Sequence, residues 1–326
     1  MTPDSQKAQE GMKFKLPEHH PPKERRSGNG GHLFSNGFHY PYTVLSGDVD
    51  QFKHTSFANY VKIMFQAADS FFLMSLGQAK IHAGEIRLIH SELYFKRQTV
   101  TGDKLSVRVT WKGGNARRIT LAFHYSMKPG EEIVAEGNQI YELNSESNAE
   151  INRNISQALN QIKDTNYDST IPEYPRQSDL EIPPKVYTYD KIKIYFKHTD
   201  YFGHLHPYNY FEWTSHVREA FFSEKCHDFN QLLKSPIAMM TAKIELFLFE
   251  PCLFADEIEA RLNVTRVKKV SFDIWIRFFN KRIGRVVSST RHTLVFFDTR
   301  NMKFSEIPTT IHDQMMPFFV PDTWKA

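Results

Sequence analysis

Cysteine is scarce in this chain of 326 residues, which contains only Cys226 and Cys252. The two stand in no spacing typical of a metal or redox site, so the sequence predicts neither a disulfide scaffold nor a cysteine metal centre. Such sparing use of cysteine favours a reducing compartment. Long apolar runs are also missing, so no segment is expected to span a bilayer. The N-terminus lacks a basic start followed by an apolar stretch, so no signal peptide is predicted and a cytoplasmic protein is expected.

The chain has no strong excess of charge of either sign: 41 Lys and Arg against 37 Asp and Glu give a net charge of +4. The sequence has no basic stripe that alternates with aromatic residues, so nucleic acid is not an expected partner. Phe, by contrast, is abundant with 27 residues, and aromatic residues make up 14% of the chain. This abundance favours an aromatic-rich core, with a tunnel for a hydrophobic ligand as the alternative.

One short pattern occurs twice, 150 residues apart, and seven of the 23 ungapped columns that begin at residue 50 are identical. The first copy has Asp50, Phe52, His54, Asn59 and Tyr60, and the second has Asp200, Phe202, His204, Asn209 and Tyr210. The repeated set includes an acid, an imidazole and an amide, whereas a duplicated core alone would repeat apolar residues. It therefore indicates two copies of one domain, each with a version of the same chemical site.

Composition shifts along the chain suggest the limits of the two copies. Downstream correspondences at an offset of 153 residues, such as Glu92 with Glu245, extend the duplication over whole domains. Polar and proline-rich stretches flank the copies and cannot bury enough apolar surface to order themselves. We expect a flexible tail over 1–38, domains over 39–143 and 185–310, a linker over 144–184 and a C-terminal tail over 311–326.

The hydrophobic pattern predicts the same order of elements in both copies: a strand, a long amphipathic helix and an antiparallel meander. In the first copy, a strand is expected over 42–50, a helix from about 57 to 72, and strands over 86–89, 93–95, 105–109 and 119–123. Gly102-Asp103 and Gly113-Gly114 are expected hairpin turns. A weak helix is predicted over 155–162. The second copy is expected to have a strand over 186–196, a helix over 210–222, and strands over 244–249, 258–264, 272–278 and 286–297.

A helix wrapped by an antiparallel sheet, with an acid just before the helix and His, Asn and Tyr around its start, resembles the hot-dog fold. The second copy, Asp200-Tyr-Phe-Gly-His204-Leu, followed by Asn209-Tyr210, Trp213 and Arg218, is similar to the pattern of the 4-hydroxybenzoyl-CoA thioesterase-like and acyl-ACP thioesterase families. The resemblance implies an α+β double hot-dog, paired as a pseudo-dimer within one chain. It also implies hydrolysis of an acyl thioester on CoA or acyl carrier protein, with no cofactor and no metal. Further assembly into a homo-oligomer stays open.

Thioester hydrolysis needs a carboxylate that attacks the carbonyl or activates water, and donors for the developing oxyanion. The free N–H groups and the dipole at a helix start favour negative charge beside it, where both acids lie. The family resemblance assigns the nucleophile or general base to Asp200 and Asp50. His204 and His54 would orient the acid, position water or donate to the leaving thiolate. Asn209 and Asn59 would hold water or the carbonyl. Expected substrate-binding residues are Tyr210, Tyr60, Phe57 and Arg218.

Both copies depart from the family pattern. Lys53 stands where the family prefers Gly, and Pro207 stands where a backbone N–H can stabilise the oxyanion. Proline has no N–H, although it suits the first position of a helix. Phe57, at the same place in the first copy, retains the N–H. The second copy therefore lacks this oxyanion donor unless the Tyr208 N–H or a side chain substitutes. Either one site works, or both work with altered geometry.

Structural roles compete with the catalytic ones. Either acid could cap a helix, and each tyrosine begins a buried helical face. The spacing of His198, His204 and His206 fits no known zinc pattern, so no metal is expected there. No Gly-x-Ser-x-Gly elbow occurs, which argues against a serine hydrolase. A non-catalytic acyl-binding protein with decayed sites and a hot-dog hydratase or dehydratase are the alternative functions.

Overall fold

A computed structural model describes residues 25–26, 32–33, 37–49, 54–76, 86–115, 118–127, 132–143, 180–200, 203–232 and 234–321. The chain divides into two units, residues 1–35 and 36–326. In the first unit, β1 (Arg25–Arg26) pairs antiparallel with β2 (His32–Leu33). The second unit contains all the remaining elements described below.

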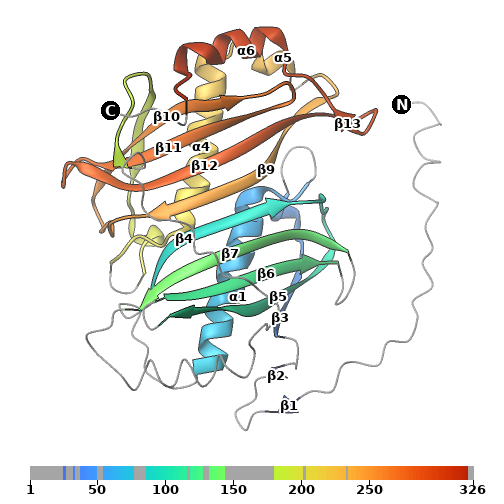
Figure 1. Cartoon of the computed structure of the whole chain (residues 1–326), viewed down its shortest axis with the longest axis vertical. Helices are drawn as coiled ribbons and strands as arrows, with labels where there is room; N and C mark the ends of the chain where they lie inside the picture. Colours follow the sequence, from blue (N-terminus) through green and yellow to red (C-terminus); the bar gives the residue numbers. More distant parts are fainter. Residues whose placement is uncertain are drawn as a thin grey trace. The chain divides into compact units, whose positions relative to one another are not determined.

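The second unit is organised by an antiparallel sheet, which has 11 strands in the part of the chain that the structure describes. The order across the sheet is β3-β5-β6-β7-β4-β9-β12-β11-β10-β8, with β13 beside β12 (Figure 1). The strands of the first half are β3 (Phe38–Thr43), β4 (Ile86–Phe95), β5 (Lys104–Asn115), β6 (Arg118–Ser126) and β7 (Ile133–Leu143). Those of the second half are β8 (Tyr187–Lys193), β9 (Ile237–Leu248), β10 (Glu257–Val267), β11 (Ser271–Asn280), β12 (Arg285–Asp298) and β13 (Lys303–Phe304).

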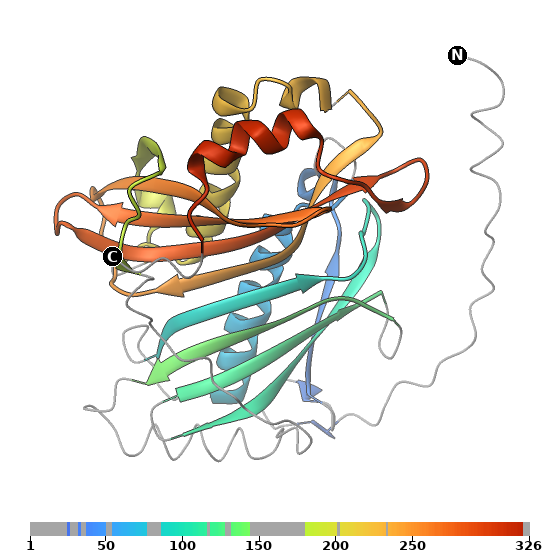
Figure 2. The same cartoon turned by 45° about the horizontal axis from the view of Figure 1, so that its top comes forward.

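Two long helices, α1 (Phe57–Leu76) and α4 (Tyr208–Lys225), lie on the same face of this sheet (Figure 2). They contact each other through the rings of Phe65 and Phe211, whose centroids are 6.4 Å apart. Apolar residues recur every three or four positions along each helix, so one face of each is buried against the sheet. Val61 and Val217, on α1 and α4, are completely buried. The main core therefore lies between the two helices and the inner face of the sheet.

The predicted succession along the chain, a strand, a long helix and then further strands, is confirmed in both halves. Each half runs through a strand, a one-turn 3-10 helix, a long helix and four sheet strands. The 3-10 helices are η3 (Ser46–Asp48) and η4 (Phe196–His198). The second half adds α5 (Phe229–Leu232) after its long helix. None of the described helices has the length and apolar character needed to cross a membrane.

Several sequence-based expectations need correction. The first strand is β3, not residues 42–50, and η3 occupies the end of that range. Gly113-Gly114 lies inside β5, paired with β6, rather than in a turn. Gly102 is in a turn, yet β4 and β5 are not neighbours, because β4 crosses to pair with β7 on one side and β9 on the other. The strands of the first half therefore do not form a simple meander. Because β4 pairs with β9, the sheet continues from the first half into the second.

The ends of the second unit also differ from the expected tails. Phe38, the last residue of the expected N-terminal tail, begins β3 and is buried. Where the sequence placed a C-terminal tail, the structure has α6 (Thr309–Met315) and η5 (Met316–Phe318). Ile311 and Met315 are buried, so this segment contributes apolar surface to the core. The helix predicted over 155–162 lies outside the described residues.

Candidate functional site

Two equivalent loops lead into the long helices, and their backbones are held in the same way. An isolated antiparallel bridge closes each loop, between Val49 and Thr55 in the first and between Thr199 and Leu205 in the second. The Thr55 N–H donates to the carbonyl of Thr99 at 2.8 Å. The Leu205 N–H likewise donates to the carbonyl of Cys252 at 2.8 Å. The duplication seen in the sequence therefore extends to the hydrogen bonds of the two loops.

The two repeated asparagines fasten these loops. Asn59 Nδ2 donates to the Asp48 carbonyl at 2.9 Å and to Ser56 Oγ at 3.0 Å. Asn209 Nδ2 donates to the carbonyls of His198 and His206 at 3.0 and 2.8 Å. The amide N–H groups expected to face water or a carbonyl thus face their own loops, which leaves Oδ1 for the predicted role.

The repeated tyrosines are core residues. Tyr60 and Tyr210 are 1% and 2% exposed. The Tyr60 hydroxyl shares a 2.8 Å hydrogen bond with Thr99 Oγ1, and the Tyr210 hydroxyl donates to Cys252 Sγ at 3.2 Å. Burial raises the pKa of Tyr60 to about 12 and that of Tyr210 well above its ordinary value, so both hydroxyls stay neutral. Their burial favours packing over the substrate contact that the sequence predicted.

Asp200 and His204 lie close together in the second loop, which precedes α4. The His204 backbone N–H donates to Asp200 Oδ1 at 2.9 Å, and His204 Nδ1 is 3.7 Å from Asp200 Oδ2. Their side chains are 31% and 45% exposed for the acid and the histidine. Between them, Gly203 has φ of +79°, a left-handed conformation that disfavours other residues. The loop therefore presents one accessible carboxylate whose orientation is fixed by the backbone.

A further histidine and acid, which the sequence analysis did not assign to this site, join it from the two halves. His206 packs against Phe65 of α1, with ring centroids 5.3 Å apart. Burial lowers the pKa of His206, while the charges of Asp69 and Asp200 oppose that shift. Asp69 is exposed on α1, yet desolvation by its surroundings raises its pKa, and the charge of His206 opposes that shift. Because α1 supplies Phe65 and Asp69, no local pattern in the sequence could have connected them with the second loop.

The backbone donor at the start of α4 is altered as the sequence indicated. Pro207 precedes the helix with φ of −57° and has no N–H to offer. The Tyr208 N–H, considered as a substitute, donates to His206 Nδ1 at 3.3 Å. An oxyanion would therefore compete with the His206 ring for this donor. In the first half, Phe57 begins α1, and the first N–H groups of a helix have no partner within it.

The start of α1 is covered by polar residues from the second half. The Phe57 ring lies 4.8 Å from the ring of His292, and the Arg218 guanidinium is 5.4 Å from the Phe57 centroid. His292 Nε2 and Thr241 Oγ1 are 2.7 Å apart. Burial, assisted by the charge of Arg218, lowers the pKa of His292 well below its ordinary value. Phe57 and Arg218, both predicted substrate-binding residues, are thus brought together.

The first-half acid cannot be placed in this arrangement. Asp50 and Lys53 lie outside the described residues, whereas His54 is described and half-buried. A pocket of about 530 Å³ lies elsewhere, and none of the described candidate residues lines it. Its lining includes Arg87, Arg118 and Arg285 together with Leu180 and Ile182.

Comparisons with known proteins agree with the sequence resemblance. Residues 194–315 match the sequence profile of the Thioesterase-like superfamily, a range that includes Asp200, His204, Asn209 and Arg218. No significant match occurs among curated protein sequences. Among solved structures, the chain is similar to a Lactobacillus plantarum protein assigned as an oleoyl thioesterase, with a TM-score of 0.61 and 11% identity over 79% of this chain and 95% of the other.

Two acyl-ACP thioesterases show the same likeness. The 12:0-ACP thioesterase of Umbellularia californica has a TM-score of 0.59 and 13% identity, over 79% of this chain and 97% of the other. An acyl-ACP thioesterase of Bacteroides thetaiotaomicron has a TM-score of 0.57 and 14% identity, over 79% of this chain and 96% of the other. The chain therefore shares the fold of these proteins, and its residues 194–315 are similar in sequence to the thioesterase-like superfamily.

Proposed function

We propose that this protein is a cytoplasmic double hot-dog thioesterase that hydrolyses an acyl thioester of CoA or acyl carrier protein. Domains over 39–143 and 185–310 would form a pseudo-dimer through α1, α4 and the continuous sheet. The placement of Asp200 carries the proposal: an accessible carboxylate in the loop that leads into α4, beside His204, within the superfamily match. The domain limits and the nature of the acyl group remain parts of the proposal.

Asp200 would act as nucleophile or as general base. As a base, it takes a proton from water while the water oxygen bonds to the thioester carbonyl carbon. The C–S bond then breaks, the acid is released, and the thiolate takes up a proton. The Asp200 carboxylate is suited to this role because the His204 N–H fixes one of its oxygens and leaves the other beside the His204 ring. The α4 dipole would favour the developing negative charge.

A binding protein without hydrolytic activity is the second candidate. It is favoured by Pro207, which removes a donor, and by the contact between the Tyr208 N–H and His206, which engages the next one. Such a protein would hold the acyl thioester at the same place without stabilising the oxyanion. It would not need the Asp200 charge.

The test is thiol release from a panel of acyl-CoA and acyl-carrier-protein substrates. We expect Asp200→Asn to lower kcat about 10²- to 10⁴-fold, the usual contribution of a positioned acid or base. Asp50→Asn and the double variant establish whether the first half contributes. Asp190→Asn, on the exposed surface of β8, is the matched control and should retain full activity.

Binding measured on the same variants separates the two candidates. A wild-type protein that binds acyl thioesters without turnover, with equal binding by Asp200→Asn, would contradict the hydrolase and favour the binding protein. Full turnover by the double variant would contradict the role of both acids.

A further inference from the structure

The seam between the two halves places two carboxylates face to face. In the β4–β9 pairing, Glu92 is the direct partner of Glu245. Like charges directly opposite each other in a sheet destabilise the pairing. A cation at this position, where the two halves are joined, would offset the repulsion.

Lys243 supplies a cation on one side of the carboxylate pair. Its Nζ lies 2.8 Å from Glu245 Oε1 and 3.5 Å from Glu92 Oε2. Glu92 also accepts hydrogen bonds from Asn138 Nδ2 at 2.8 Å and from the Tyr94 hydroxyl at 3.1 Å. Each carboxylate has about four lone-pair positions, so these contacts leave acceptor capacity on both acids.

The other side of the pair has a histidine where the internal repeat would place a second lysine. The offset of 153 residues that relates Glu92 to Glu245 also relates His90 to Lys243. In the sheet, His90 pairs with Phe247, just as Tyr94 pairs with Lys243. The β4–β9 pairing thus follows the internal repeat except at these two positions, where Lys243 lies on one side of the carboxylate pair and His90 on the other.

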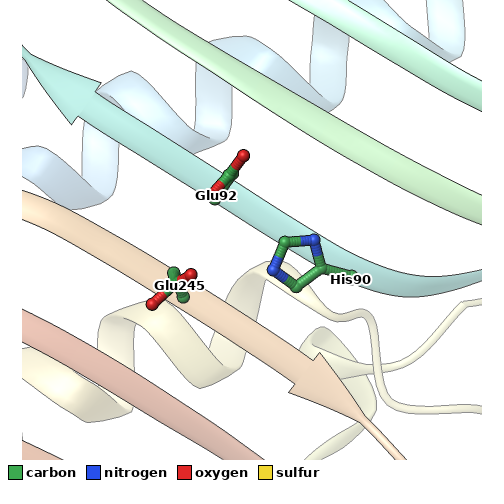
Figure 3. Close-up of side chains that lie close together, drawn as sticks. All are labelled: His90, Glu92 and Glu245. Atoms are coloured by element: carbon green, nitrogen blue, oxygen red, sulfur yellow. The ribbon is translucent and has the colours of Figure 1, made fainter. Parts of the chain in front are cut away.

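His90 is buried without a hydrogen-bond partner. It is 2% exposed, its ring packs 4.8 Å from the Phe247 ring, and neither ring nitrogen has a partner among the described residues. A neutral imidazole keeps a lone pair on one ring nitrogen, which can bind a metal ion. An unsatisfied buried polar group destabilises the folded state, so this arrangement needs an explanation. Figure 3 shows the ring extending from β4 toward both carboxyl groups.

We propose that His90, Glu92 and Glu245 bind a divalent transition-metal ion of the zinc class, with water as the fourth ligand. One nitrogen or oxygen atom from each of the three residues lies within 4.8 Å of the others. Zinc takes imidazole and carboxylate ligands at about 2.0–2.2 Å in tetrahedral geometry. The ligand atoms would therefore draw together by about 1–1.5 Å, which rotation of the two flexible glutamate side chains can supply. The ion would clamp β4 of the first half to β9 of the second.

The Lys243 ammonium competes with a metal ion for the two carboxylates. Removing it should therefore raise the affinity for Zn²⁺, whereas removing a ligand should lower it. The purified full chain is stripped with a chelator and titrated with Zn²⁺ by calorimetry. We expect binding of one ion at this site, weakened at least tenfold in His90→Phe and in Glu245→Gln. Lys243→Met should bind Zn²⁺ more tightly, because it frees carboxylate lone pairs. Glu142→Gln, which removes an exposed acid from β7, should bind like the wild type.

Two further readouts make the result decisive. Co²⁺ should give the visible absorption bands of a tetrahedral nitrogen and oxygen site in the wild type and not in His90→Phe. Zn²⁺ should raise the unfolding temperature of the wild type more than that of Glu245→Gln, because ligand binding stabilises only the folded state. If His90→Phe fails to fold, the Zn²⁺ affinities of Glu245→Gln and Lys243→Met still test the proposal.

The proposal is overturned if the wild type binds no Zn²⁺, or if its binding is the same in Glu245→Gln and Lys243→Met. Zinc held by other histidines of the chain would give that second result. Because the ion is a clamp and takes no part in hydrolysis, the outcome is independent of the thioesterase assay.

Discussion

At the residue scale, the duplication preserves side chains that hold the loops more faithfully than side chains that face the site. Asn59 and Asn209 make equivalent hydrogen bonds, and both tyrosines are buried in the same place. Phe57 and Pro207, at equivalent positions where the helices start, differ, and so do Ala68 and Arg218. Loss of a buried hydrogen bond costs stability in either half, whereas a change at the site can be accommodated if only one half needs to work.

We predict that Asn209→Ala and Asn59→Ala each lower the free energy of unfolding by about 1–3 kcal/mol, because two backbone or hydroxyl acceptors lose their donor. Asn209→Asp should be no better, since it keeps the shape of the side chain and loses the N–H groups. Ser223→Ala, on the exposed side of α4, is the control. Denaturant unfolding measures the differences, and an unchanged midpoint for Asn209→Ala would contradict the fastening role.

At the element scale, the close approach of α1 to the sheet depends on a glycine in β7. A Cβ atom on Gly137 would lie 2.5 Å from the Glu92 carbonyl oxygen, 2.9 Å from Leu93 Cδ1 and 3.2 Å from Met64 Sδ. The first of these contacts is to the backbone of the neighbouring strand, which cannot move without disturbing the β4–β7 pairing. The absence of a side chain at this position therefore lets helix and sheet pack closely.

Gly137→Ala is accordingly expected to destabilise the protein by about 1–3 kcal/mol, the usual cost of overpacking a core. Gly47→Ala is the matched control, because its new Cβ would meet nothing within 4 Å. Guanidinium unfolding of both variants provides the comparison. Equal unfolding midpoints for the two variants would contradict this prediction, because they would show that the β7 backbone can shift to make room for the new Cβ atom.

At the scale of the whole molecule, each half completes its neighbour. The start of α1 is covered by Arg218 and His292 from the second half, while α1 places Phe65 against His206 and the charge of Asp69 close enough to raise the His206 pKa. The sheet is continuous through β4 and β9. The two candidate sites therefore depend on the association of the halves. Separating the halves would expose the residues of both sites to solvent.

Stability should depend on pH through histidines that lose contact with water on folding. The folded pKa of His292 lies well below its ordinary value of 6.5, and that of His206 is also lowered. As the pH falls below about 6.5, the unfolded chain binds protons that the folded protein does not. The free energy of unfolding should then fall by up to about 1.4 kcal/mol per pH unit for each such histidine.

His292→Gln tests this dependence with a residue that the fold already accepts, because Gln139 is the buried counterpart of His292 in the first half. Unfolding measured between pH 7 and 5 should show a shallower slope in the variant. His216→Gln, at an exposed position of α4, should keep the wild-type slope. A variant slope as steep as that of the wild type would assign the effect to other groups.

The sequence by itself determined the duplication, the two long helices and most of the strands, because these follow from local periodicity and from residues repeated along the chain. It also determined the superfamily resemblance, since the motif from Asp200 to Tyr210 is contiguous. Only the tertiary structure decided that β4 pairs with β9, that the asparagines fasten their loops and that His206 packs against Phe65. These are contacts between residues far apart in the chain, and strand order and register are set by packing across the whole sheet rather than by any local pattern.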